Sequence, residues 1–457
     1  MRTIIRPVGA IAIAVAISVV APLSTQAEEA ASQIPNLEQR LMALEDRLAA
    51  SEATVASQKK VISAANLDSA LARDEGNVSF WNGVVMGGHV AASYSYNWNN
   101  PSAGSVSQPL NTFNRSHQEF QLDAAKLEIG RPTDGPGTAG FQFDILYGQN
   151  ADILRGISPS LSFPTAPTNV PALQGDDEAS FFLQQAYVAY NFNGVELKLG
   201  RWETLLGYEM LDTNDNPNIS HGLLFTWAIP FYHTGLLASG NISENLSWSA
   251  GIANGTNNST ENNDQKAAVA QIAYKSGNFG TSLSGYYGFD NQTGQGAPPV
   301  SSSDSNYVLD LVTTLQVTDA LGFWVNVDYG EGEDLDPISG DDAAWWGYSA
   351  GAKFDISDST YFAVRYEYFT DDDNVRGIGT SPGLGLMAAA DDFEATSITG
   401  TLGHQLTDRL LVRAEVRYDE ADDDSVPTGG AIFPDDSAAG FEDDEVFAIV
   451  EAVFSLD

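Results

Sequence analysis

Residues 406–419 read LTDRLLVRAEVRYD and contain both signals that decide the fold. The first five residues form a short turn, in which Thr and Asp side chains can bond to the backbone. The rest alternates in character: Val412, Ala414, Val416 and Tyr418 share one face, and Arg413, Glu415, Arg417 and Asp419 share the other. A period of two predicts a β-strand with one apolar and one polar face.

The same alternation recurs along the chain, for example at residues 186–192 and 362–368. From residue 78 onward the sequence predicts strands and no helix. Alternation alone does not decide the class, because a soluble β-sandwich shows it as well, with its apolar face inward.

The connections between the strands decide the fold class. Tight turns similar to the first one occur at 242–246, 317–321 and 356–360, and Asn193-Gly194 and 276–278 are equally short. Asp, Asn and Gly suit two- or three-residue hairpins. Between these turns lie long polar connections, at 99–116, 150–180, 208–231, 255–265, 290–305, 330–343, 370–391 and 419–443. Strict alternation of short and long connections predicts an outer-membrane barrel, with all short turns at one rim.

This rule predicts sixteen strands, at 84–98, 118–131, 139–149, 181–192, 195–207, 232–242, 246–254, 266–276, 279–289, 306–318, 321–330, 344–357, 360–370, 392–407, 410–419 and 445–456. The predicted fold is therefore an all-β, transmembrane antiparallel barrel preceded by a short helical coiled coil. To keep charged residues off the lipid face, we expect bulges near Ala124-Ala125 and at Gly200. A barrel of this width encloses a water channel unless a loop or plug enters it.

Composition excludes several other classes. The chain has 61 acidic and 21 basic residues, a net charge of −40 that repels nucleic acid. It has no cysteine, so disulfides and thiolate sites are excluded. A mean hydropathy of −0.16 with 43% hydrophobic residues argues against a helical membrane protein.

The N-terminus predicts secretion. Arg2 and Arg6 precede an apolar stretch from Val8 to Val20, and small residues before Ala27 resemble a cleavage site. We therefore expect a signal peptide over residues 1–27. The alternative, an anchoring transmembrane helix, needs about 20 apolar residues.

The segment after the predicted signal peptide has a different hydrophobic period from the strands. Ile34, Leu37, Leu41, Leu44, Leu48, Ser51, Val55, Gln58 and Ile62 follow heptad a and d spacing. Residues 34–62 therefore predict a short coiled coil within a periplasmic segment and linker at 28–76, ahead of a barrel at 77–457. A coiled coil also predicts a homotrimer. The alternative is one amphipathic helix packed on its own domain.

Three stretches resemble a known family. They are 181–187 with 197–209, then 215–220 with 228–235, and 364–371 with Arg376-Gly377 just beyond. Together they are similar to the OmpL-like beta-barrel porins. The resemblance implies an outer-membrane channel, without an agreed substrate, and a periplasmic N-terminal coiled coil like those ahead of some porins.

The sequence offers little for catalysis. Its five histidines, at 89, 117, 221, 233 and 404, lack metal-site spacing, and a hydrogen-bonding role suits His233 better than catalysis. We therefore predict no enzyme, no catalytic residue, no cofactor and no specific metal site. An outer-membrane hydrolase with residues on different strands remains an alternative that motifs do not test.

Alternation on the polar faces predicts the pore lining. The candidates are Lys198, Arg201, Glu203, Arg365, Glu367, Arg413, Glu415 and Arg417. Facing basic and acidic rows would produce a transverse field that favours polar solutes, and the same residues could also form an ion-pair ladder that stiffens the wall. Acidic clusters in the long connections suggest divalent-cation binding, or simply a solvated surface.

These observations predict an outer-membrane porin for passive diffusion of small hydrophilic solutes or ions, surrounded by outer-membrane lipid. The longest connection, 150–180, is the candidate to constrict the channel or to cap it. The alternative function is an envelope-organising anchor, in which the coiled coil contacts the cell wall and the barrel only holds it in the membrane.

Overall fold

The computed structural model describes residues 83–101, 110–114, 116–157, 181–261, 264–289, 305–333, 341–372, 376, 393–421, 432–434, 436 and 441–456. The chain divides into two units after residue 82, and only the second unit, from Gly83 onward, is described. The predicted signal peptide (1–27) and coiled coil (34–62) lie outside these residues.

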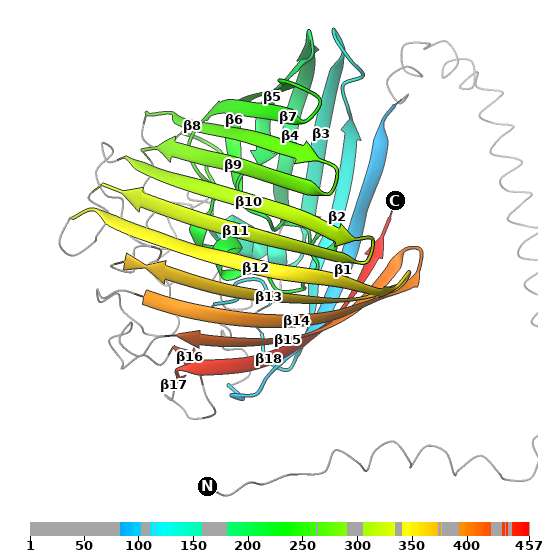
Figure 1. The fold of residues 1–457 in the computed structure, drawn as a ribbon, viewed down its shortest axis with the longest axis vertical. Coiled ribbons are helices and arrows are strands. Elements are labelled where there is room, and N and C mark those ends of the chain that lie inside the picture. Colours follow the sequence, from blue (N-terminus) through cyan, green and yellow to red (C-terminus); the bar gives the residue numbers. More distant parts are fainter. Residues whose placement is uncertain are drawn as a thin grey trace, which may run out of the picture. The chain divides into compact units, whose positions relative to one another are not determined.

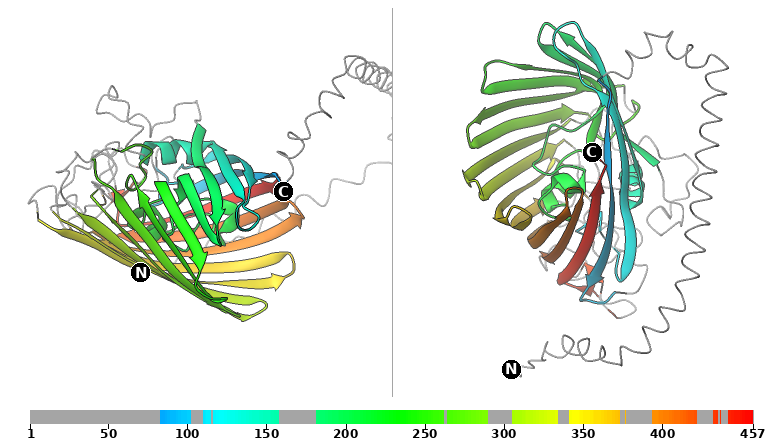
Figure 2. Two further views of the ribbon diagram at one scale, coloured as in Figure 1. Left: turned by 90° about the horizontal axis from the view of Figure 1, so that it is seen from above. Right: turned by 90° about the vertical axis from the view of Figure 1, so that its right-hand side faces the viewer.

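Sixteen strands form one closed antiparallel barrel (Figure 1, Figure 2). Each pairs with its neighbours in the sequence, and β1 pairs with β18 to close the ring. The strands are β1 (Val85–Asn97), β2 (Glu119–Arg131), β3 (Ala139–Tyr147), β4 (Phe181–Phe192), β5 (Val195–Glu203), β6 (Tyr232–Asn241), β7 (Leu246–Ala253), β8 (Ala267–Ser276), β9 (Phe279–Gly288), β10 (Asn306–Thr318), β11 (Leu321–Gly332), β12 (Ala343–Ser357), β13 (Thr360–Asp371), β14 (Phe393–Thr407), β15 (Leu410–Ala421) and β18 (Asp444–Ser455). The predicted fold class is confirmed.

The remaining elements lie in the long connections: the helix α4 (Gln149–Ile157), the 3-10 turn η3 (Thr213–Asp215), the π-helical turn η4 (Leu224–Ala228), and β16 (Phe433–Pro434) paired with β17 (Phe441–Glu442). The expectation of no helix was wrong for α4, which follows Gly148 at a φ of 120° and ends β3 early. Within the described ranges, no helix is long and apolar enough to cross a membrane.

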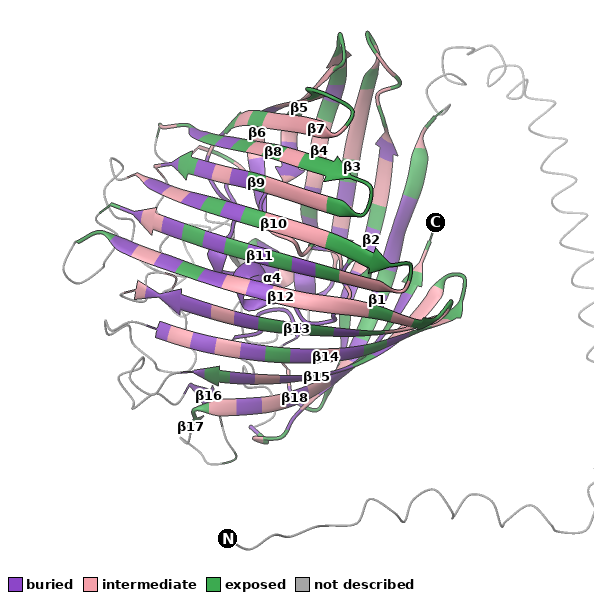
Figure 3. Cartoon of the chain, in the orientation of Figure 1, coloured by how far each residue is buried: buried purple, intermediate pink, exposed green. Residues whose placement is uncertain are grey.

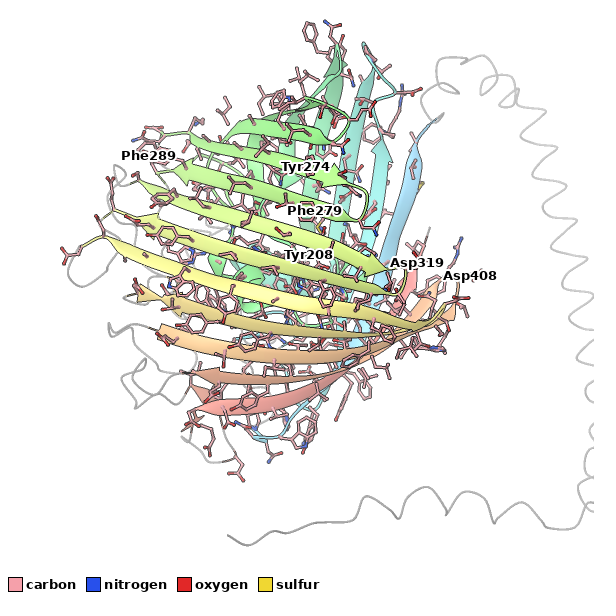
Figure 4. The ribbon with its side chains drawn as sticks, viewed as in Figure 1. Tyr208, Tyr274, Phe279, Phe289, Asp319 and Asp408 are labelled. Atoms are coloured by element: carbon pink, nitrogen blue, oxygen red, sulfur yellow. The ribbon has the colours of Figure 1, made fainter. Side chains whose placement is uncertain are left out.

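Short turns gather at one rim, as predicted. Asn193 and Gly194, with φ of 52° and 91°, make the two-residue turn between β4 and β5. In Figure 4, Asp319 and Asp408 lie together at the short-turn rim, whereas Phe289, at the start of a long connection, lies at the opposite end.

The wall has an apolar outer face and a polar inner face. Along β15, Ala414 and Val416 are exposed, while Arg413, Glu415 and Arg417 are buried inside. The same alternation of exposed and buried residues runs along most strands in Figure 3. An apolar surface on the outside is the reverse of a soluble protein and is what a lipid bilayer requires.

One expected bulge is present and one was misplaced. In the pairing of β1 with β2, the register shifts at Asp123, beside the expected Ala124. Through Gly200, however, β5 pairs without a shift on either side, and the bulge falls at Gln184 in β4. Arg201 nonetheless avoids lipid, because it is only 8% exposed.

Candidate pore constriction

The connection between β5 and β6, residues 204–231, folds into the barrel. We call it the inner segment. Every residue from Asn218 to Phe231 is buried, and Figure 2 shows coils of this part of the chain within the ring of strands. The predicted strand 195–207 was therefore too long, since the chain leaves the wall after Glu203.

Arg413 on β15 holds the first half of the inner segment. Its Nε donates to a Glu451 carboxylate oxygen of β18 at 2.9 Å, and its Nη1 donates to the carbonyls of Asn216 and Asn218 at 2.8 and 3.3 Å. The Thr213 hydroxyl donates to the other Glu451 oxygen at 2.9 Å. One ion pair between two strands thus binds both the backbone and a side chain of the inner segment.

Glu415, two residues along β15, binds the next part. Its carboxylate accepts the backbone N–H groups of Ile219 and Ser220 at 2.6 and 2.9 Å, and the Thr401 hydroxyl at 2.6 Å. Asn218 Nδ2 donates to the oxygen of the same Thr401 at 2.7 Å. Backbone groups of the inner segment therefore have partners on the wall, which buried groups require.

A third contact group lies on β13. Arg365 forms ion pairs with Glu367, at 2.9 Å, and with Glu209 of the inner segment, and it donates to the Ser220 carbonyl at 2.9 Å. Glu209 also accepts the Gly222 N–H at 2.6 Å. A Cβ on Gly222 would lie 2.1 Å from the Glu367 carboxylate, so a larger residue here would have to displace Glu367 from its ion pair with Arg365.

Arg417 completes the row. Its Nε donates to Asp419 at 2.7 Å, its Nη1 donates to the His221 carbonyl at 2.7 Å, and its guanidinium lies over the Phe447 ring. The inner segment is thus held at successive points by charged groups on the inner face of β13, β15 and β18, and also by Lys126 of β2, which forms an ion pair with Asp212.

The eight predicted lining residues fall into two groups. Five of them, namely Arg365, Glu367, Arg413, Glu415 and Arg417, are at most 2% exposed and lie against the inner segment. The other three lie on β5, away from that cluster. The structure therefore brings the five together and leaves the three apart.

The three residues on β5 have different surroundings. Lys198 is partly exposed, pairs with Glu196 at 3.5 Å and lies over the Tyr187 ring. Arg201 donates to the Leu183 carbonyl at 2.5 Å and to Ser259. Its guanidinium also lies over the rings of Phe182 and Tyr232.

Glu203 is the third residue on β5. It accepts a hydrogen bond from Gln184 at 2.6 Å. Gln184 is the residue at the β4 bulge, and it also donates to Asp212 of the inner segment at 3.3 Å. The β4 bulge thus joins β5 to the inner segment.

An apolar core occupies the barrel near the long-connection rim. Phe113, from the connection between β1 and β2, packs against His221, Phe225 and Phe231 with ring centroids 4.6 to 6.1 Å apart. The same core includes residues of α4 and of β16, such as Leu154 and Phe433, so several connections converge on it. We call this cluster the inner core.

His221 sits in the inner core. Burial lowers its pKa to about 4, so the imidazole is neutral at pH 7. Its Nε2 lies 3.0 Å from the Met210 carbonyl, and its ring stacks on Phe225. A proton added here would be placed among apolar rings and close to Arg365.

His233, in β6, has both ring nitrogens in use. Its Nδ1 lies 3.0 Å from the Gly255 carbonyl and must donate, so its Nε2, 3.2 Å from Thr204, accepts. This agrees with the predicted hydrogen-bonding role. Within the described residues, no group of three or more His, Asp or Glu side chains is arranged to hold a metal ion.

Toward the short-turn rim the inner wall has different chemistry. Lys198 with Glu196, and Lys353 with Asp355, form ion pairs between residues two apart on one strand, and all four side chains are partly exposed. Opposite charges so close together cancel at a distance. These two pairs therefore add polar groups but little net charge to this part of the inner face.

Sequence reasoning did not predict that residues 204–231 fold into the barrel, and it did not count Glu209 and His221 of this segment, or Glu451 on the wall, among the lining residues. It pointed to the longer 150–180 connection, of which only the start, including α4, is described. A signal was present: residues 219–231 read ISHGLLFTWAIPF, far more apolar than the other long connections. An apolar connection in a membrane barrel needs a core to pack into.

A closed barrel with an apolar outer wall, a polar inner wall and a connection folded into it defines a bacterial outer-membrane channel. The family model described as putative beta-barrel porin-2, OmpL-like, matches residues 83–456. The chain therefore belongs to this family of outer-membrane porins, and the predicted resemblance is confirmed.

Solved structures share this fold. One is the anion-selective porin from Comamonas acidovorans, at 12% identity and a TM-score of 0.52, covering 82% of this chain and 99% of that chain. Another is OprB of Pseudomonas putida at high pH, at 13% identity and a TM-score of 0.50, covering 84% and 96%. No curated protein sequence matches the chain.

Proposed function

We propose that this porin is a passive diffusion channel for small hydrophilic solutes or ions, and that the inner segment forms its constriction. The observation that carries the proposal is the docking of residues 204–231 on the polar inner face of β13, β15 and β18 through Arg365, Arg413 and Glu415. The segment also bonds to other parts of the wall, through Lys126 of β2 with Asp212 and through Asn326 of β11 with the Tyr208 N–H. A segment held across the lumen in this way narrows the water path.

The five buried lining residues then act on the pore indirectly. They fix the position of the inner segment, and the segment sets the size of the opening. This role corresponds to the ion-pair alternative that the sequence left open, with the difference that the ladder holds a loop as well as the wall.

Solute contact falls instead to the partly exposed polar residues toward the short-turn rim. Lys198 with Glu196 and Lys353 with Asp355 provide paired charges without a large net field. Such a wall favours small polar solutes over apolar ones and discriminates weakly between anions and cations. Acidic residues in the long connections would add cation preference only at the mouth.

The remaining expectations belong to this proposal. The porin would assemble as a homotrimer, with residues 28–76 forming a periplasmic coiled coil, and its acidic long connections would bind divalent cations at the cell surface. The alternative, an envelope anchor whose barrel does not conduct, rests on the same 28–76 segment.

Conductance in planar bilayers tests the proposal and separates it from the anchor. The natural protein should form channels, and a variant whose residues 210–222 are replaced by a short Gly-Ser linker should form wider ones. A control variant with the short turn at residues 243–245, at the opposite rim, replaced by Gly-Ser residues should conduct like the natural protein. Absence of conductance in all three would refute the channel and favour the anchor.

A further inference from the structure

Two aspartates face each other on the inner wall, away from the contacts described above. Asp310 of β10 and Asp328 of β11 are directly opposite in the register of the two strands. Both side chains are fully buried, at 0% exposure. Like charges directly opposite each other destabilise a sheet, so this pair needs compensation.

No basic residue provides it. Among the described residues, none of the ion pairs includes Asp310 or Asp328. Asn326 Nδ2 donates to Asp310 Oδ1 at 2.7 Å, and the Gly207 N–H and the Ser284 side chain also interact with Asp310. Both carboxylate oxygens of Asp328, in contrast, have no donor in hydrogen-bond geometry. Asp328 is thus a fully buried carboxylate without a donor in hydrogen-bond geometry, although nearly all buried polar atoms have one.

We propose that Asp310 and Asp328 together bind one hard divalent cation, of the Ca²⁺ or Mg²⁺ type, inside the barrel wall. The carboxylates supply both negative charges that such an ion needs. The polar groups around them are also oxygen-rich: Asn326 Oδ1 accepts the Tyr208 N–H at 2.9 Å, and Ser284 Oγ donates to the Leu205 carbonyl at 2.9 Å. Oxygen ligands select Ca²⁺ or Mg²⁺ over zinc or copper.

The site lies beside the start of the inner segment. Leu205 and Tyr208 are at the start of the inner segment, and Tyr208, labelled in Figure 4, stacks on Trp324 of β11 at 4.9 Å. A cation at Asp310 and Asp328 would stiffen the wall on which this start rests. This consequence depends on the proposed constriction, but binding of the cation does not.

A shared proton is the competing explanation, because one proton between two carboxylates also removes their repulsion. The two explanations differ in what an Asp→Asn substitution does. Asp328→Asn removes the repulsion in both cases. It abolishes cation binding in the first, whereas in the second there is no binding to lose.

The test uses the folded, full-length mature protein in detergent and counts bound Ca²⁺ by equilibrium dialysis. We expect Asp328→Asn, and separately Asp310→Asn, to bind one Ca²⁺ fewer per chain than the natural protein. Asp319→Asn, at an exposed short turn, is the matched control and should bind as many as the natural protein. Folding of each variant is checked by its gel mobility before and after boiling.

A second readout is local. Tb³⁺ in the site should give emission sensitised by Trp324, which Ca²⁺ displaces and which Trp324→Phe reduces without changing the Ca²⁺ count. Equal Ca²⁺ counts in the natural protein and both Asp→Asn variants would overturn the proposal. That result would mean surface binding of an adventitious ion only and would assign the pair a shared proton, whether or not conductance is observed.

Discussion

Replacing Arg413 by methionine should release the inner segment. Arg413 is fully buried and makes an ion pair with Glu451 and hydrogen bonds to two carbonyls of the inner segment. Methionine keeps much of the side-chain volume but removes every one of these bonds. It also leaves the Glu451 carboxylate buried without its positive partner.

The loss of the positive partner of Glu451 sets the size of the expected change in docking. Removing one member of a buried ion pair typically costs about 3–5 kcal/mol, because the remaining charge is uncompensated. Detaching the inner segment would expose Glu451 to the water of the lumen and recover much of that cost. At about 1.4 kcal/mol per factor of ten, the ratio of detached to docked segment should rise by about two to four orders of magnitude.

Single-channel recording in planar bilayers measures this ratio as time spent in a wider conductance state. Arg409→Met is the matched control, since Arg409 is exposed at the short-turn rim and only bonds the Leu456 carbonyl. The double variant Arg413→Met with Glu451→Leu removes both charges and should return toward the natural behaviour. An Arg413→Met channel with natural conductance and noise would refute the docking role of Arg413.

Four further outcomes are expected. Because burial lowers the pKa of His221 to about 4, docking should weaken as pH falls below 6.5 and lose about 3 kcal/mol by pH 4. In the natural protein, wider conductance states should therefore be more frequent at pH 4.5 than at pH 7, and this increase should be smaller in His221→Phe. The mature protein should run at different gel positions before and after boiling, and identical mobility would count against the closed barrel. Deletion of residues 34–62 should leave the barrel inserted but weaken the trimer in native gels or cross-linking; an unchanged trimer would assign those residues to packing on their own domain. With a net charge of −40, reversal potentials should show modest cation preference in dilute salt that fades near 1 M, where the screening length is about 3 Å, and anion preference at low salt would move control to the wall arginines.

The barrel itself could be predicted because its signals are local. Strand alternation such as that of residues 410–419 needs only a period of two, and turns such as Asn193-Gly194 are set by backbone preferences of two residues. Both signals can be read from the sequence without knowledge of distant contacts. The errors at strand ends, at 149 and at 204–207, occur where the chain leaves the wall for a tertiary reason.

The inner segment could not be placed in the same way. Its contacts join residues far apart in sequence, such as Arg413 with Asn216 and Arg365 with Ser220. Alternation correctly assigns Arg413 and Arg365 to the inner face, but it does not say whether water or another part of the chain covers that face. The bulge in β4 was also hidden, because Gln184 and Gln185 are both polar and fit either register.

The inner segment combines two kinds of contact that do different physical work. The inner core around Phe113, Phe225 and Phe231 removes apolar surface from water, which stabilises docking but fixes its geometry poorly, since apolar contacts have little direction. The bonds from Arg413 and Arg365 to backbone carbonyls contribute less net stability, because burying a charge offsets much of the gain. They are directional, however, and they act on backbone groups whose positions define the register of the segment against the wall. We infer that the core keeps residues 204–231 inside the barrel, while the buried arginines determine where they lie and hence how wide the opening is.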